Sequence, residues 1–170
     1  MIYVVRHGET EWNAMNKVLG RTDMPLNDTG IQQAHEIASA LKDLNIEVFL
    51  CSPMIRARQT ADVISGETGI DYKVDERLIE QDFGSFEGVY RYDEAYQNAK
   101  REYFARYPGG ESFFDLAARV FPLIKELEGK DVVLYSSDLM RAKQTAGFIA
   151  ERLQVTPVYR TELRERNLGK

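Results

Sequence analysis

Short, mainly apolar runs alternate along this chain with longer segments whose apolar residues recur at helical spacing. Ile2–Val5, Ile46–Cys51 and Asp131–Tyr135 are predicted strands, and the first and last are expected to be buried on both faces. Ile55–Ser65 and Leu139–Leu153, which follow the last two strands, are predicted helices. Strands that alternate with helices pair in parallel. The sequence therefore predicts an α/β fold in three layers, with a mostly parallel central sheet covered by helices on both faces.

The helix starts carry recognisable signals. Asn27 follows Pro25 and Leu26 and is the predicted N-cap of the first helix. The apolar positions of that helix keep helical spacing and are Ile31, Ala34, Ile37, Ala38, Leu41 and Leu44. Ser112 and Asp115 form a capping-box pattern ahead of a further helix.

Three other segments show weaker patterns. Thr10–Met24 has no clean period and is predicted to be a loop folded over the site. Tyr72–Val74 is a candidate short strand. Val89–Tyr107 is aromatic and charged, and we expect an insertion with irregular or helical structure.

An arginine, a histidine and a glycine stand directly after the first predicted strand, as Arg6, His7 and Gly8. Ligand sites of parallel α/β sheets lie at the carboxyl ends of the strands. There a neutral imidazole can attack phosphorus, an arginine fork can bind phosphate oxygens, and a glycine lets backbone amides approach the same anion. The alternatives are a surface turn or a core histidine satisfied by the backbone. The pattern favours a phosphoryl-transfer site with His7 as nucleophile.

A second candidate phosphate ligand, Arg56, stands at the start of the helix after the second strand. Helix N-termini attract anions, and an arginine there adds bidentate hydrogen bonds. The alternative is an arginine that faces solvent. Arg58 lies on another face of the same helix, and His35 lies within the first helix, so both are expected at the surface.

Composition limits the classes of function. The 170 residues suit a single domain over residues 1–170, and 44% hydrophobic with 29% charged residues is typical of a globular protein in water. The net charge of −5 argues against nucleic acid as a partner. No apolar run reaches the roughly 18 residues that span a bilayer, and the N-terminus lacks the pattern of a secretory signal. The single cysteine, Cys51, suits the cytoplasm, and a zinc site is not expected.

The stretch from Arg6 to Asn13, Arg-His-Gly-Glu-Thr-Glu-Trp-Asn, resembles the histidine phosphatase superfamily of phosphoglycerate mutases and related phosphatases. This resemblance implies a phosphoglycerate mutase-like fold and a phosphohistidine intermediate on His7. It implies a small phosphorylated metabolite as partner and no metal or other cofactor. Hydrolysis of phosphomonoesters is the favoured activity, because the family's mutases carry longer insertions than this chain. Mutase-type phosphoryl transfer is the alternative, and the oligomeric state is left open.

The resemblance also assigns roles to individual residues. Ser52–Ala61 matches the family pattern around Arg56. Leu78–Gly88 resembles the family stretch whose first glutamate donates a proton to the leaving group, which singles out Glu80 among several nearby acids and gives Glu87 a structural role. The substrate-binding positions implied by the resemblance are Gly8, Thr10, Asn13, Gly20, Arg21 and Ser137.

The carboxyl-terminal part departs from the family pattern. The family's second histidine after a late strand is absent, and Ser137 stands in roughly its place. Residues 133–169 instead repeat 48–84 at a shift of 85 positions, with Arg141 and Glu165 corresponding to Arg56 and Glu80. Loss of one charged donor from a phosphoryl site costs roughly 10²–10³ in rate. The chain could therefore be a slowed enzyme, an enzyme in which Arg141 substitutes, or a protein that only binds phosphorylated ligands.

Overall fold

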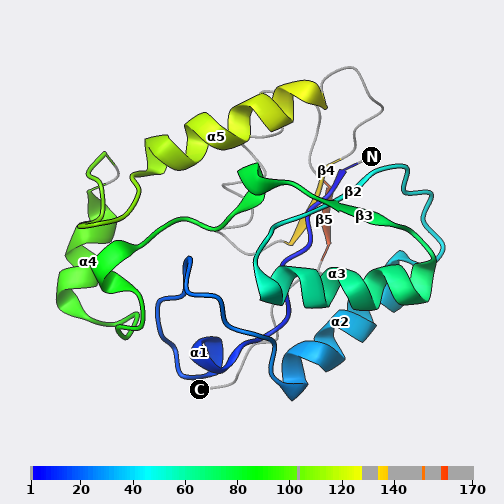
Figure 1. The fold of residues 1–170 in the computed structure, drawn as a ribbon, viewed down its shortest axis with the longest axis horizontal. Coiled ribbons are helices and arrows are strands. Elements are labelled where there is room, and N and C mark those ends of the chain that lie inside the picture. Colours follow the sequence, from blue (N-terminus) through cyan, green and yellow to red (C-terminus); the bar gives the residue numbers. More distant parts are fainter. Residues whose placement is uncertain (1, 103, 128–133, 138–150, 152–157, 161–170) are drawn as a thin grey trace. The chain divides into compact units, whose positions relative to one another are not determined.

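A computed structural model describes residues 2–102, 104–127, 134–137, 151 and 158–160 (Figure 1). The helices and strands, in chain order, are β1 (Ile2–Tyr3), α1 (Glu11–Ala14), α2 (Asp28–Leu41), β2 (Phe49–Cys51), α3 (Ile55–Thr68), β3 (Tyr72–Val74), the 3₁₀ turns η1 (Glu76–Leu78) and η2 (Gly84–Phe86), α4 (Glu94–Arg101), α5 (Phe113–Glu126), β4 (Leu134–Ser137) and β5 (Val158–Arg160).

Contacts within the chain group it into two compact units. One unit is His7–Val120, and the other combines Met1–Arg6 with Phe121–Lys170. The division falls between Arg6 and His7 and again within α5. The single domain expected over residues 1–170 stays a prediction.

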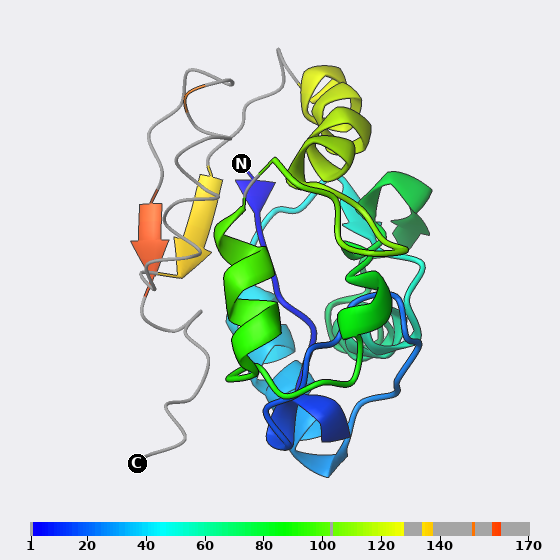
Figure 2. The same cartoon turned by 90° about the vertical axis from the view of Figure 1, so that its left-hand side faces the viewer.

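Every strand pair that the structure describes is parallel. In the unit that contains both ends of the chain, β4 lies between β1 and β5, with Tyr135 opposite both Tyr3 and Val158. Figure 2 shows β4 and β5 side by side and pointing the same way. In the other unit, β2 pairs with β3 in the register Phe49 to Tyr72. Parallel strands alternating with helices confirm the α/β class.

The predicted elements agree with the structure at most positions. The strand at Tyr72–Val74 and the N-cap of α2 at Asn27 are confirmed, and α3 begins at Ile55 as expected. The segment beyond Val89 contains α4, consistent with its expected insertion. The predicted helix over Leu139–Leu153 lies outside the described residues apart from position 151.

Several expectations need correction. The second strand, expected over Ile46–Cys51, begins only at Phe49, and α2 ends at Leu41, before the predicted helical position Leu44. The first strand ends at Tyr3, and Val4 is 46% exposed, so Ile2–Val5 is not a strand buried on both faces. The loop predicted from Thr10 onward opens with the short helix α1. The late strand ends at Ser137 rather than Tyr135, while residues 131–133 lie outside the described part.

Helices α2 and α3 pack against each other (Figure 1), and both contribute buried residues to the core of their unit. On α2 the buried apolar positions are Ala34, Ala38 and Leu41, which fall on one helical face. On α3 the buried positions are Arg56, Thr60, Ala61 and Ile64. An arginine and a threonine on the inner face of a helix must find polar partners there, because burial of an unpaired polar group is costly.

Two glycines bring the segment after β1 close to the start of α2. A Cβ at Gly8 would lie 2.7 Å from the carbonyl carbon of Gly30, and a Cβ at Gly30 would lie 2.7 Å from the amide nitrogen of Glu9. Asn27 adds a side-chain hydrogen bond to Glu9 at 2.9 Å. The backbone next to His7 therefore rests directly on the first turn of α2.

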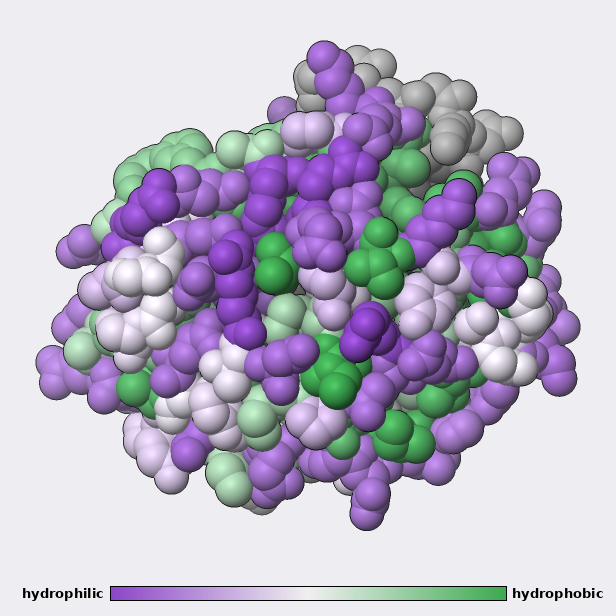
Figure 3. All heavy atoms as spheres, viewed as in Figure 1, coloured by the Kyte–Doolittle hydropathy of each residue, from purple (hydrophilic) through white to green (hydrophobic). Residues whose placement is uncertain are grey.

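On the face seen in Figure 3, hydrophilic side chains cover most of the area, with hydrophobic ones scattered among them. Within the part of the chain that the structure describes, no helix is long and apolar enough to cross a membrane.

The close approach at Gly30 predicts opposite effects for two glycine-to-alanine changes in helices. Gly30→Ala should lower the free energy of unfolding by roughly 1–3 kcal/mol, because its methyl group would overlap the backbone of Glu9. Gly66→Ala in α3 should raise it by about 0.5–1 kcal/mol, because that position faces open space. Urea denaturation followed by circular dichroism measures both, and a stabilised Gly30→Ala would contradict the packing described here.

Candidate active site

The ring of His7 has both of its nitrogens engaged. Nδ1 lies 2.6 Å from the carbonyl oxygen of Gly8, and Arg56 Nε lies 3.2 Å from Nε2. A carbonyl oxygen can only accept a hydrogen bond, and an arginine Nε–H can only donate one. The neutral tautomer with its proton on Nδ1 satisfies both contacts. Nε2 therefore carries a lone pair, as a nucleophile requires.

Arg56 is 1% exposed and lies in the first turn of α3. Besides the His7 ring, its guanidinium donates to the carbonyl oxygens of Gly20 at 2.7 Å and Thr22 at 3.2 Å. Hydrogen bonds of this kind are what make a buried cation tolerable. The structure thus brings the candidate residues Arg56 and His7 together, and an arginine facing solvent is excluded. The role of Arg56 as a phosphate ligand stays a prediction.

The residues after Arg56 hold neighbouring segments in place. The Thr60 hydroxyl accepts from the Gly8 amide at 3.1 Å and donates to the Arg56 carbonyl at 2.9 Å. Gln59 accepts from the Leu26 amide at 2.8 Å. These roles of Gln59 and Thr60 were not predicted from the sequence. The signal was present, because the Gln-Thr-Ala that follows Arg56 recurs in the repeat at 144–146.

The two predicted substrate-binding glycines have structural roles. The buried amide of Gly8 donates to Thr60, and the glycine is needed for its close contact with Gly30. A Cβ at Gly20 would lie 2.6 Å from a carboxylate oxygen of Glu87, and its carbonyl holds Arg56. Both glycines therefore shape the site through close contacts that a side chain would prevent. Contact of Gly8 and Gly20 with substrate stays a prediction.

Thr10 and Asn13 form a capping box at the start of α1. The Thr10 hydroxyl accepts from the Asn13 amide at 3.3 Å, and the Asn13 side chain accepts from the Thr10 amide at 3.1 Å. Thr10 is fully buried. The reason for both residue types is thus found in local helix capping, and contact with substrate stays a prediction.

The N-terminus of α3, expected to attract a phosphate, is already occupied by a carboxylate. Asp23 accepts from the amide of Ile55 at 2.7 Å. An acidic side chain is favourable there because the helix dipole is positive at that end. The Ile55 amide is therefore engaged, and contact of the α3 N-terminus with phosphate stays a prediction.

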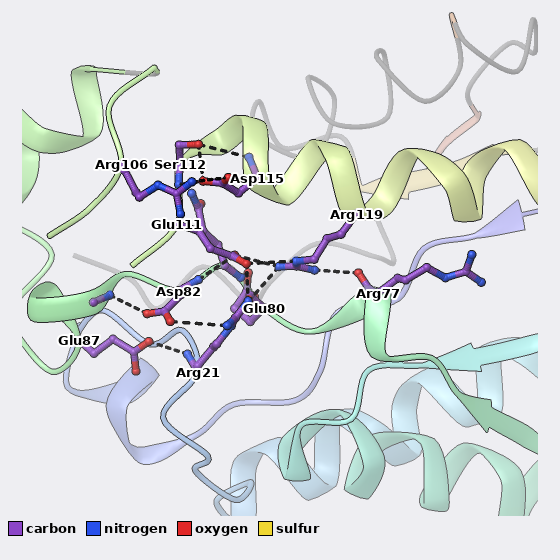
Figure 4. A network of polar contacts seen from close by, with 12 residues as sticks. Arg21, Arg77, Glu80, Asp82, Glu87, Arg106, Glu111, Ser112, Asp115 and Arg119 are labelled. Atoms are coloured by element: carbon purple, nitrogen blue, oxygen red, sulfur yellow. Dashed lines mark hydrogen bonds and ion pairs between the residues drawn. The ribbon is translucent and has the colours of Figure 1, made fainter. Parts of the chain in front are cut away.

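The side chain of Arg21 points into a network of charged groups (Figure 4). It pairs with Glu111 and lies 3.6 Å from a carboxylate oxygen of Asp82, and its Nε donates to the Glu80 carbonyl at 3.4 Å. The guanidinium of Arg21 is thus engaged with acidic partners, and its contact with substrate stays a prediction.

Arg119 on α5 completes this network from the other side of Glu111. It donates to Glu111 at 3.1 Å, to the Glu80 carbonyl at 3.2 Å and to the Arg77 carbonyl at 2.7 Å. Burial by itself would raise the pKa of Glu111, but hydrogen bonds from Arg119 and the Asp82 amide, with the charges of Arg119 and Arg21, outweigh it and lower that pKa. Glu111 is therefore an anion at neutral pH.

Glu80, the predicted proton donor, is half-buried, and its carboxylate accepts from the amide of Gln81 at 2.9 Å. Glu87 has the structural role expected of it. Its carboxylate accepts from the amides of Arg21 and Thr22, each at 2.6 Å, and from the Thr22 hydroxyl. The prediction for Glu87 is confirmed, and the catalytic role of Glu80 stays a prediction.

Arg6 and Ser137 belong to the other unit. Arg6 is exposed, and Ser137 is the last residue of β4. Their contacts with phosphate stay predictions.

Other potential nucleophiles fit the chemistry less well. Burial raises the pKa of Cys51 to about 11, with a smaller contribution from Asp62, so this thiol stays protonated at neutral pH. His35 is exposed on α2 and pairs with Glu67, as expected for a surface residue. Among the described residues, no cluster of three or more histidine, cysteine or acidic side chains could hold a metal ion.

Comparison with known proteins finds a matching family model and similar relatives. The sequence model of the histidine phosphatase superfamily (branch 1) matches residues 2–132 and, a second time, residues 128–170. The second match covers the segment in which the sequence repeats. The chain is 36% identical to probable phosphoglycerate mutase GpmB of Escherichia fergusonii over 126 residues, which cover 70% of this chain. The chain spans 59% of the length of that relative.

Solved structures give the same result. A mycobacterial glucosyl-3-phosphoglycerate phosphatase in complex with VO3 is 32% identical, with a TM-score of 0.67 over 75% of this chain and 66% of that one. An Escherichia coli protein described as a putative alpha-ribazole-5'-P phosphatase is 28% identical, with a TM-score of 0.64 over 72% of this chain and 64% of that one. These similarities confirm the phosphoglycerate mutase-like α/β fold.

The contacts of the His7 ring predict its tautomer in solution. At a pH at which the His7 ring is neutral, ¹⁵N NMR of the imidazole should show a protonated Nδ1 and an unprotonated Nε2. The Gly8 carbonyl accepts from Nδ1, and Arg56 donates to Nε2. Arg56→Met should weaken this preference, because it removes the donor to Nε2. His35, with an exposed ring, provides the internal reference signal. A wild-type His7 ring protonated at Nε2 would contradict the assignment.

Proposed function

Because this chain belongs to the histidine phosphatase superfamily, we propose that it is a phosphomonoester hydrolase that works through a phosphohistidine on His7. One observation carries the proposal: Nε2 of His7 faces the guanidinium of a buried arginine, with Arg56 Nε at 3.2 Å. Because Arg56 Nε–H can only donate, this contact leaves Nε2 unprotonated. A nucleophilic nitrogen next to a fixed cation is the arrangement that attack on a phosphate anion requires.

The proposed reaction has two steps. His7 Nε2 attacks phosphorus, the bond from phosphorus to the ester oxygen breaks, and Glu80 gives its proton to the leaving oxygen. Water then attacks the phosphohistidine, the phosphorus–nitrogen bond breaks, and the Glu80 carboxylate takes up the water proton. Entry of the phosphoryl group replaces the hydrogen bond from Arg56 to Nε2 with contacts to phosphoryl oxygens. The substrate class is a small phosphorylated metabolite.

Mutase-type transfer is the second candidate, and the name of the Escherichia fergusonii relative favours it. A mutase must hold its intermediate long enough to return the phosphoryl group to a second acceptor, whereas a hydrolase needs only access for water. We prefer hydrolysis for this chain because its similarity extends to phosphatases as well as to a mutase. A third candidate, a protein that binds phosphorylated ligands without turnover, follows from the absent second histidine.

The two histidines provide a matched test of the nucleophile. His7→Ala should lower kcat/KM for an aryl phosphate by at least about 10³, because the attacking nitrogen is lost, whereas His35→Ala on the exposed face of α2 should leave it unchanged. Brief reaction of the wild type with radiolabelled substrate should trap an acid-labile phosphoryl group that is absent from His7→Ala. Equal activity of His7→Ala and wild type would contradict the proposal, and ligand binding without turnover would support the third candidate.

Hydrolase and mutase are separated by the fate of the phosphoryl group. With 3-phosphoglycerate as substrate, we expect release of inorganic phosphate and no build-up of 2-phosphoglycerate, because water is the acceptor. Phosphorus NMR measures both products in one sample. Formation of 2-phosphoglycerate in the presence of a bisphosphate primer, without release of phosphate, would favour the mutase. The His7→Ala variant is the control for contaminating enzymes.

A further inference from the structure

The peptide segment that carries Glu80 is held by charged side chains from outside it. The carbonyl oxygen of Glu80 accepts from Arg119 Nη2 at 3.2 Å and from Arg21 Nε at 3.4 Å. The same Arg119 donates to the Arg77 carbonyl at 2.7 Å, three residues earlier in the chain. Arg119 thus bridges both ends of the stretch 77–80 from its position on α5.

Glu111 fixes the two arginines with respect to each other. Arg119 reaches it from α5 and Arg21 from the loop after α1 (Figure 4). Glu111 also contacts Asp82, which follows Glu80 in the chain. Its carboxylate accepts from the Asp82 amide at 3.2 Å, and its own amide donates to the Asp82 carbonyl at 2.9 Å. The backbone is therefore clamped on both sides of Glu80.

The shielding of this cluster from solvent favours a rigid arrangement. Arg119 and Glu111 are mostly shielded from solvent, with side-chain exposures of 19% and 14%. Shielded ion pairs with several hydrogen bonds have defined geometry, unlike exposed pairs. Removal of either partner would leave a shielded charge without its counterpart and free the Glu80 segment to shift.

We infer that Arg119 and Glu111 are positioning residues that hold the Glu80 segment in place for proton transfer to the leaving group. The inference rests on the proposed function, in which Glu80 is the acid. A displacement of about 1 Å in a catalytic group can cost roughly 100-fold in rate. Loss of the clamp should therefore slow reactions that need the proton and spare those that do not.

The test compares two aryl phosphates that differ in the basicity of their leaving groups. Phenyl phosphate needs a proton donor, whereas 2,4-dinitrophenyl phosphate releases a stable anion without one. The ratio of their kcat/KM values reports proton transfer during formation of the phosphoenzyme. It is independent of the fraction of enzyme that is folded, because that fraction cancels.

Glu80→Gln calibrates the readout, with a loss of roughly 10²–10⁴ for phenyl phosphate alone. Arg119→Met and Glu111→Gln should each lose roughly 10- to 100-fold for phenyl phosphate and change little for 2,4-dinitrophenyl phosphate. Arg106→Met is the matched control, because Arg106 pairs with Asp115 at 2.7 Å on the surface with its side chain 65% exposed. That variant should leave the ratio unchanged.

Equal losses on both substrates, or no loss on either, in both Arg119→Met and Glu111→Gln would overturn the inference while leaving the proposed function intact. Failure of the proposed function has a separate signature. Wild-type turnover that survives His7→Ala, or Glu80→Gln without selective loss on phenyl phosphate, would remove the acid that the clamp is inferred to hold, and the inference would fall with it.

Discussion

The described site depends on the hydrogen bonds that the buried guanidinium of Arg56 donates. A cation with 1% exposure is stable inside a protein only if its N–H groups meet acceptors. The ring of His7 and the carbonyls of Gly20 and Thr22 are those acceptors. The loop after α1 must therefore fold over the start of α3. The lack of a side chain at Gly20 serves another contact, because a Cβ there would lie 2.6 Å from a carboxylate oxygen of Glu87. One buried charge thus sets the orientation of the imidazole and the path of the loop.

Three consecutive residues of this loop link the two halves of the proposed chemistry. The carbonyls of Gly20 and Thr22 face Arg56 and so support the nucleophile. The side chain of Arg21, between them, pairs with Glu111 and donates to the Glu80 carbonyl. The loop that was predicted to contact substrate therefore also links Arg56, which contacts His7, to the segment that carries Glu80.

Sequence motifs predicted the role of a residue best where its interaction partners lie within the same short stretch of the chain. The capping residues Asn27 and Ser112 were predicted because an N-cap and its partners lie within a few positions of each other. Thr60 and Arg119 were missed, because their partners Gly8 and Glu80 lie 52 and 39 residues away in the chain. Gly8 was assigned to phosphate binding on residue type, and only packing against Gly30 revealed its structural role.

The sequence by itself determined the α/β class and the succession of most helices and strands. It also singled out His7 and Arg56 as candidate site residues. These follow from periodicity and from motifs that are local in the chain. Tertiary structure decided the tautomer of His7, the burial of Arg56 and the clamp around Glu80. Each of these depends on which carbonyls and carboxylates from distant segments meet the side chain, and such distances are set only when the whole unit packs.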